Sequence, residues 1–458
     1  MRLASAQGKW LLAAMILGSG MAFLDGSVVG LALPAITRDL GGGLPGQQWT
    51  VNAYTLTLAA LILVGGSLGD RLGRRRVFVV GVVWFAAASV ACALAPTIEV
   101  LVAARGLQGV GAALLTPGSL AIISASFVPE DRGPAIGVWS GLAGVTTAIG
   151  PLVGGWLVDS VGWRSIFWIN VPLAAAVVYL SVKRVPETTG EQKKLDLGGA
   201  ALTAAGLAFL TYGLVEKSWM WSIGGVLVLV AFVVHQKVTP HALVPLELFA
   251  NRVFTAANIC TFAIYGALAA SGFLLVLQLQ YVAGFSPLEA GLSTIPATIL
   301  MLLFSAKAGA LATRIGPRWP MTFGPLVAAG GLLWWLMIDE DATFWIDVLP
   351  GSVIFGVGLV LLVAPLTTAV LAAAPDMQTG IASGINNAVA RTASLLAVAA
   401  IPPIAGIAGS DFADPDVFAP GFRMGTLICV GMLVVAGACA AALIHGRAVS
   451  PEALLADD

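Results

Sequence analysis

Fourteen apolar stretches, each long enough to cross a lipid bilayer, restrict the possible folds of this chain more than any other feature. A helix rises about 1.5 Å per residue, so about 20 residues span the hydrocarbon core. Inside a bilayer every backbone polar group must be bonded within the protein, which leaves helices as the solution for runs of this length. The runs cover residues 11–33, 48–68, 77–95, 98–126, 135–157, 163–182, 197–215, 220–236, 253–282, 287–306, 320–338, 344–372, 380–406 and 421–444.

The composition agrees with an integral membrane protein. Hydrophobic residues make up 58% of the chain and charged residues only 10%, whereas soluble domains carry about 25% charged residues. The formal net charge of −1 gives no indication of a nucleic-acid partner. The four cysteines lie inside apolar runs without metal-ligand spacing, so we expect neither a disulfide nor a metal site. The first run is too long for a signal-peptide core and is interpreted as the first span.

The loop charges indicate the orientation. An even number of spans places both termini on one side of the membrane. If that side is the cytoplasm, most Lys and Arg residues outside the runs fall in cytoplasmic loops, including the cluster at residues 71–76. Only Arg38, Arg164, Lys217 and Arg423 then fall on the outer side, in loops or at the outer ends of runs. The positive-inside rule therefore predicts a multi-pass cell-membrane protein with both termini cytoplasmic.

A short internal repeat indicates how the spans are grouped. The sequence RLGRR at 71–75 corresponds to RIGPR at 314–318, and this register sets spans 9 and 10 over spans 1 and 2. We therefore predict an all-α membrane protein with two six-helix bundles, residues 1–185 and 241–458, separated by a two-helix hairpin, residues 186–240. Repeated halves of this kind are typical of transporters, whose substrate sites lie near the middle of the bilayer.

Four sequence motifs carry a family resemblance. They are FLDGSVVGLALPAI at 23–36, GDRLGRRRV at 69–77, RGLQGVGAA at 105–113 and GPLVGGWLVDSVGWRSIFWINVP at 150–172. With these motifs the chain resembles the major facilitator superfamily, in particular its fourteen-span drug:proton antiporter family. The resemblance implies proton-driven export through a fourteen-helix major facilitator fold. We expect a monomeric transporter without enzymatic activity or cofactor. No P-loop motif is present, which argues against ATP as the energy source.

Asp25 and Arg105 are the candidates for proton coupling. A carboxylate within a span is costly to bury and is usually functional. Counted at the helical rise, Asp25 lies roughly 13 Å, and Arg105 roughly 11 Å, from the outer ends of their spans, so the two depths coincide. The pair could be a permanent ion pair that solves the burial of both charges. Alternatively, protonation of Asp25 loosens a charge network that includes Arg105, which is also the role that the resemblance assigns.

Two glycine-containing motifs are candidates for conformational roles. The loop between spans 2 and 3 could anchor the topology, or it could act as a latch that breaks as the halves move; the resemblance favours a latch that stabilises the outward-facing state. Span 5 offers glycine pairs that allow close helix packing, and the resemblance adds a seal against proton leak. The latch candidates are Gly69, Asp70, Arg71, Gly73, Arg74 and Arg75, and the span 5 motif comprises Gly137, Gly141, Gly144, Gly150, Pro151, Gly154 and Gly155.

Polar side chains within the spans are the candidates for the substrate cavity. Each could equally be a packing residue that bonds neighbouring helices. They are Tyr54, Asn52, Gln108, Asn258, Gln278, Asn386, Asn387 and Arg391. We expect the protein to exchange protons for amphipathic small molecules, as multidrug exporters do. Export of one defined metabolite, lipid or antibiotic is the alternative, and a channel or sensor is a further one.

Overall fold

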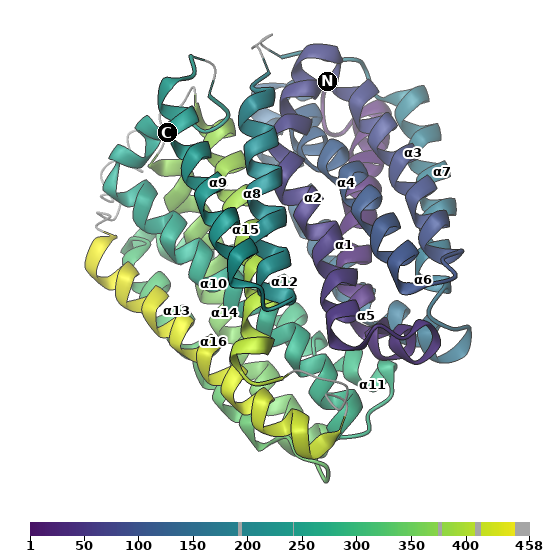
Figure 1. Cartoon of the computed structure of the whole chain (residues 1–458). Coiled ribbons are helices and arrows are strands. Elements are labelled where there is room, and N and C mark those ends of the chain that lie inside the picture. Colours follow the sequence, from purple (N-terminus) through teal and green to yellow (C-terminus); the bar gives the residue numbers. More distant parts are fainter. Residues whose placement is uncertain (191–194, 241, 374–377, 408–413, 445–458) are drawn as a thin grey trace. The chain divides into compact units, whose positions relative to one another are not determined.

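The described part of the chain is built from helices (Figure 1). The computed structural model describes residues 1–190, 195–240, 242–373, 378–407 and 414–444, with the side chains at 140, 141, 143–145, 147, 148, 313 and 379 left out. The chain forms two compact units. The first unit holds Met1–Leu243 and Phe285–Gly291, and the second holds Val244–Gly284, Leu292–Ile407 and the last helix.

The first unit contains the helices that precede residue 243. They are α1 (Ala6–Leu40), α2 (Gly43–Leu72), α3 (Arg74–Ala93), α4 (Ile98–Ser126), α5 (Pro129–Ser160), α6 (Ser165–Trp168), α7 (Asn170–Arg184), α8 (Leu197–Val215) and α9 (Trp219–Val238).

The second unit begins with a 3₁₀ turn, η1 (Leu246–Ala250), and contains long helices with short irregular turns at their ends. They are α10 (Arg252–Leu277), the π turn η2 (Gln278–Val282), α12 (Ile295–Ile315), α13 (Arg318–Trp334), η3 (Trp335–Met337), η4 (Phe344–Val348), α14 (Leu349–Ala372), α15 (Thr379–Ile404) and α16 (Pro415–Leu443). The short helix α11 (Pro287–Leu292) precedes α12 and lies, up to Gly291, in the first unit.

Thirteen helical segments among the described residues are long and apolar enough to cross a membrane. The predicted all-α membrane fold is therefore confirmed. The predicted span over residues 135–157 corresponds to α5, a helix of 32 residues that is not among the thirteen. The count of fourteen spans and the cytoplasmic position of the termini stay predictions.

The repeated loop motif has a repeated backbone conformation. Leu72 ends α2 and Gly73 follows with φ 105°; 243 residues later Ile315 ends α12 and Gly316 follows with φ 84°. A positive φ of this size is disfavoured for residues with a Cβ atom, so glycine allows the chain to leave each helix at this point. The predicted internal repeat therefore has a counterpart in the backbone of each unit.

The hairpin of α8 and α9 is attached to the first unit through an aromatic contact. The Trp49 ring of α2 lies 6.2 Å from the Tyr212 ring of α8, and Trp49 Nε1 donates to Glu216 Oε1 over 3.1 Å. The hairpin accordingly belongs to the first compact unit. The division into two bundles and a separate insert stays a prediction.

Candidate functional site

Asp25 of α1 and Arg105 of α4 form a buried ion pair. Arg105 Nη1 donates to Asp25 Oδ2 over 2.6 Å, and each residue is only 1% exposed. The similar depths estimated from the sequence agree with this contact. A buried charge without a partner would be very costly, so each residue of the pair makes the burial of the other possible.

The second oxygen of the Asp25 carboxylate is bound by two amides. Gln108 Nε2 donates to Asp25 Oδ1 over 2.8 Å, and Asn170 Nδ2 donates to the same oxygen over 3.2 Å. Both amides also donate to Ser89 Oγ, over 2.7 Å and 3.1 Å respectively. The carboxylate is thus bound by donors from α4 and α7, while Ser89 of α3 joins the two amides. We call Asp25, Ser89, Arg105, Gln108 and Asn170 the Asp25 cluster.

The guanidinium of Arg105 makes three further contacts. Its Nε donates to the backbone oxygen of Thr50 over 3.1 Å, and its Nη1 donates to Gln108 Oε1 over 2.5 Å. The Tyr54 ring lies beneath it, with 4.4 Å between Arg105 Cζ and the ring centroid, a cation–π contact that strengthens when water is excluded. Tyr54, expected in the substrate cavity, is only 6% exposed and packs against the Asp25 cluster.

Glycine residues in the RGLQG segment allow α2 to approach α4. A Cβ at Gly109 would lie 2.1 Å from Thr57 Oγ1 and 2.3 Å from the Tyr54 backbone oxygen. Thr57 Oγ1 donates to the backbone oxygen of Gly106 over 2.8 Å. Small residues therefore let the two backbones meet closely, which brings Tyr54 and Thr50 against Arg105.

The junction of α2 and α3, residues 69–76, which we call the α2–α3 loop, is bonded within itself and to the segment that follows α7. Arg74 Nε donates to Asp70 Oδ1 over 2.8 Å. The backbone N–H of Arg74 donates to Thr188 O over 2.8 Å, and that of Gly190 donates to Asp70 O over 3.0 Å. Segment 185–190, which we call the α7 linker, therefore lies against the loop. Asp70 therefore pairs with an arginine of the cluster, Arg74.

Glu187 of the α7 linker extends this contact to the arginine cluster. Its Oε1 accepts from the backbone N–H of Arg75 over 2.9 Å, and its Oε2 lies 3.6 Å from Arg75 Nε and 3.7 Å from Arg76 Nε. A Cβ at Gly73 would come within 2.7 Å of the Glu187 carboxyl. Among the other latch candidates, Arg71 is exposed and Gly69 is buried.

Span 5 glycines pack on two neighbours within the first unit. A Cβ at Gly150 would lie 2.3 Å from Ser27 Oγ, and one at Gly154 would lie 2.4 Å from Val28 Cγ1. Both neighbours are in α1, close in sequence to Asp25. A Cβ at Gly155 would meet Leu288 of α11.

The rest of the span 5 motif is less closely packed or not described. Pro151 interrupts α5 as an internal proline, and its backbone oxygen would lie 2.6 Å from a Cβ at Gly291. A Cβ at Gly137 would have nothing within 4 Å. Gly150 and Gly154 thus lie close to α1, while the surroundings of Gly141 and Gly144 lie outside the described residues.

Two of the candidates in the second unit, Asn258 and Asn386, are bonded to each other. Asn386 Nδ2 of α15 donates to Thr261 Oγ1 of α10 over 2.7 Å and to Asn258 Oδ1 over 3.3 Å. Asn387, by contrast, is exposed. For Arg391, the buried Nε atom has no hydrogen-bond partner among the described residues. The pair Asn258 and Asn386 is thus bonded between helices, and Arg391 retains an unused donor.

Two further cavity candidates are fully buried. Gln278 donates from Nε2 to the backbone oxygen of Ile338 over 2.8 Å, which ties the π turn η2 to the end of η3. Asn52 of α2 is 0% exposed, and neither atom of its amide has a hydrogen-bond partner in the part of the chain that the structure describes. Such unsatisfied groups are rare and costly.

Comparison with known proteins identifies the family. The family model described as Major Facilitator Superfamily matches residues 15–399. The chain belongs to the major facilitator superfamily. It is 37% identical over 393 residues to "Multidrug resistance protein Stp" of Mycobacterium tuberculosis, covering 81% of this chain and 71% of the relative. It is 31% identical over 401 residues to "Tetracenomycin C resistance and export protein" of Streptomyces glaucescens, covering 85% and 74%.

The fold of this major facilitator protein also matches solved structures. A crystal structure of a D-xylose–proton symporter aligns with a TM-score of 0.69 at 16% identity, covering 95% of this chain and 98% of the symporter. At such low identity the match describes the fold alone. Family and relatives indicate a multi-pass membrane transporter rather than an enzyme. Among the described residues, no group of three or more His, Cys, Asp or Glu could hold a metal ion.

Ser89, Thr50 and Asn170 were not singled out from the sequence of this major facilitator protein. Asn170 lies within the FWINVP end of the fifth-span motif, so the family resemblance offered a signal for it. Ser89 stands alone in an apolar run, and Thr50 contributes its backbone oxygen, which any residue could supply. No pattern along a single helix marks residues that meet only because five helices converge.

Proposed function

We propose that this transporter is a proton-coupled antiporter that exports amphipathic small molecules by alternating access. Asp25 is the proton site, and Arg105 is its electrostatic partner. The observation that carries this proposal is the Asp25 cluster, in which a buried carboxylate is bound by Arg105, Gln108 and Asn170. Intramembrane carboxylates in such networks are typical of proton relays.

Proton binding changes what this carboxylate can do. The ionised form accepts hydrogen bonds at both oxygens, and its charge balances the Arg105 guanidinium. A protonated Asp25 is neutral, so it no longer balances the positive charge of Arg105. Its protonated oxygen carries a donor and is a weaker acceptor for the amides of Gln108 and Asn170. Protonation therefore weakens the bonds that join α1 to α4 and α7. Helices released in this way are able to shift relative to one another.

The α2–α3 loop is the proposed latch of this cycle. Asp70 and Arg74 pair within the loop, and the α7 linker holds the loop through Thr188, Glu187 and Gly190. These bonds are partly exposed and individually weak, so they can break and re-form during transport. Asn258, Asn386 and Arg391 are proposed to contact cargo from the second unit.

A narrower cargo range is the second candidate. One relative is named for resistance to, and export of, the single compound tetracenomycin C, while another is named for multidrug resistance. Export of one defined metabolite, lipid or antibiotic therefore fits the same fold and the same Asp25 cluster.

Transport by purified protein in liposomes with an imposed pH gradient tests the proposal. Wild-type protein should accumulate cargo against its gradient only when the pH gradient is present, and a panel of dyes, antibiotics and lipids defines the cargo range. Asp25→Asn should lose pH-driven accumulation while remaining folded. Glu340→Gln, which neutralises an exposed acid in the second unit, should transport normally. Retained accumulation in Asp25→Asn would refute the role of Asp25.

A further inference from the structure

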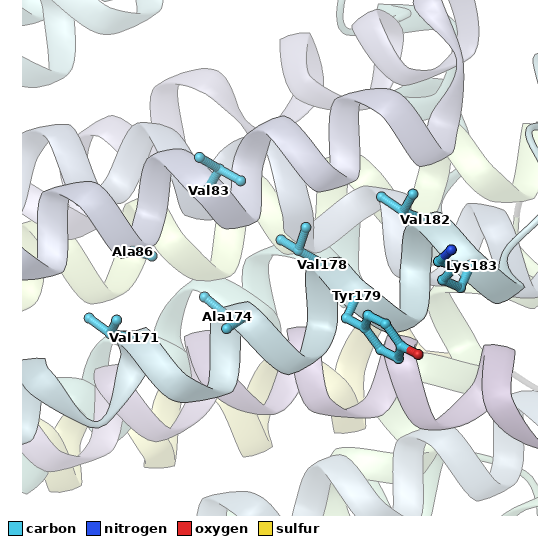
Figure 2. A pocket seen from close by; sticks show the side chains of 9 residues that line it. Val83, Ala86, Val171, Ala174, Val178, Tyr179, Val182 and Lys183 are labelled. Atoms are coloured by element: carbon cyan, nitrogen blue, oxygen red, sulfur yellow. The ribbon is translucent and has the colours of Figure 1, made fainter.

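A groove lies between α3 and α7 in the first unit (Figure 2). Its volume is about 530 Å³, within the range of roughly 300–1,000 Å³ that is usual for small-molecule sites. Val83 of α3 is 52% exposed, and Tyr179 and Val182 of α7 are 65% and 55% exposed. Both helices are candidate membrane spans, so exposed apolar residues on their shared face meet lipid.

The groove has the length of one bilayer leaflet. It extends along α7 from Val171 to Lys183, a rise of about 18 Å at the helical spacing. Half of a hydrocarbon core about 30 Å thick is about 15 Å. Its lining residues from Val171 to Val178 are apolar, and the Tyr179 hydroxyl and Lys183 amine gather at the opposite end from Val171 (Figure 2). An extended acyl chain therefore fits along α7.

Positive charge surrounds the polar end of the groove. Lys183 and Arg184 occupy the last turn of α7 and are exposed. Arg76 precedes Val83 by seven residues, which places both on one face of α3, and its side chain is 76% exposed. Glu187 lies 3.7 Å from Arg76 and 3.6 Å from Arg75. This single carboxylate cannot neutralise all the cations at this end of the groove. The loop charges predict that this end faces the cytoplasm, where anionic lipids attract basic side chains.

We propose that the α3–α7 groove binds an anionic phospholipid of the cytoplasmic leaflet. The acyl chain lies along α7, and the phosphate is held by Lys183, Arg184 and Arg76. None of the residues that line this groove is among those proposed for proton coupling or cargo contact. The long stems of Lys and Arg suit the role because they pack against apolar surface while their charged ends reach the headgroup.

Lipid in this groove supports the helices that position the Asp25 cluster. Asn170, the first residue of α7, precedes the groove residue Val171 and donates to Ser89 of α3 over 3.1 Å. The groove and this hydrogen bond therefore join the same two helices. A bound acyl chain that contacts both should stabilise their pairing, so lipid binding should raise the thermal stability of the protein.

Native mass spectrometry and thermal denaturation of the detergent-purified protein test the proposal. Phosphatidylglycerol should bind and raise the melting temperature more than phosphatidylcholine with the same acyl chains. Glycerol 3-phosphate, which has the charge without the chains, should have no effect. Lys183→Gln should weaken phosphatidylglycerol binding about fivefold, the effect of one cation near a membrane surface. Lys237→Gln, which removes an exposed cation from the last turn of α9, is the matched control.

A second variant tests the acyl-chain part of the site. Ala175 lines the groove and is exposed, so Ala175→Trp should fill the groove without disturbing buried packing, and both lipids should bind less. The proposal would be overturned if the two lipids bound and stabilised the protein equally. It would also be overturned if Lys237→Gln weakened phosphatidylglycerol binding as much as Lys183→Gln. Stabilisation by glycerol 3-phosphate would instead indicate a site for free anions. Undiminished lipid binding to Ala175→Trp would mean that the chain lies elsewhere.

Discussion

Gln108 donates from Nε2 to Oδ1 of Asp25 over 2.8 Å, the carboxylate oxygen that Arg105 does not contact. The same amide accepts from Arg105 through Oε1. Gln108 therefore contacts both members of the ion pair, and its removal takes one hydrogen-bond partner from Asp25 and one from Arg105.

Gln108→Leu should slow pH-driven efflux. The variant removes the amide that donates to Asp25 Oδ1 and accepts from Arg105 Nη1, so the ion pair loses the side chain that bridges its two members. Unfolding free energy should fall by about 1–3 kcal/mol because buried partners lose their bonds. Cargo efflux from liposomes with a fixed pH gradient measures the loss. Gln236→Leu, which removes a buried amide in the α8–α9 hairpin, should destabilise the protein but leave the efflux rate unchanged; an equal loss of efflux there would contradict the specific effect of Gln108.

Arg105→Ala should destabilise the protein by about 3–5 kcal/mol, because a buried carboxylate then lacks its cation. Combining it with Asp25→Asn should recover part of the loss, since the double variant carries no unpaired charge. Thermal denaturation of the wild type, the two single variants and the double variant forms a double-mutant cycle. If the two losses simply add, the ion pair contributes no coupling and the interpretation of the pair is wrong.

Glu187→Ala should release the α7 linker from the α2–α3 loop. The variant removes the acceptor for the Arg75 N–H and both ion pairs. Because these charges are partly exposed, stability should change by no more than about 1 kcal/mol. A cysteine at the half-buried position Thr188, introduced into a chain without its four native cysteines, should react faster with a thiol reagent. Glu247→Ala is an exposed control outside the linker; unchanged labelling in Glu187→Ala would show that backbone bonds alone hold the linker.

Asp196→Ala should destabilise the α8–α9 hairpin in a pH-dependent way. Burial acts to raise the pKa of Asp196, but bonds from Gly199 N, His235 and Gln236 outweigh it and hold that pKa below the usual 3.8. A lowered pKa in the folded state stabilises the fold above the unfolded value and loses this effect as pH falls through the folded pKa.

The melting temperature of Asp196→Ala should therefore lie furthest below that of the wild type near neutral pH. Part of the loss is the helix cap at Gly199 N, worth about 1 kcal/mol. The difference should shrink once the pH falls below about 3.8. Melting curves across this interval measure it, and a gap that stays constant would mean that the carboxylate charge is unimportant.

Much of the fold could be predicted because bilayer chemistry acts on each span separately. The apolar runs located the helices but not the helix ends: the run at 11–33 lies within α1, Ala6–Leu40. Hydropathy reflects contact with lipid, whereas the helix continues through polar residues at the membrane surface. The repeat of RLGRR as RIGPR was also visible in the sequence, and its shared glycines, Gly73 and Gly316, both have positive φ values, which glycine adopts more readily than residues with a Cβ atom.

The candidate site was only partly predictable. Asp25 and Arg105 could be identified because charges are rare in spans, and equal depth suggested their contact. Depth does not define the face of a helix, so the position of Tyr54 beneath Arg105 could not be anticipated. Asn170 reaches Asp25 and Ser89 only because α7 packs against α1 and α3, which depends on contacts between distant parts of the sequence.

The complete burial of Asp25 has a kinetic consequence. Its side chain is 0% exposed, so neither water nor hydronium reaches the carboxylate while the surrounding helices stay packed. In the proposed proton-coupled cycle, exchange with solvent requires the first unit to open, and the frequency of that opening sets an upper limit on turnover. Isotope exchange at this carboxyl would then follow helix movement, whatever the buffer concentration.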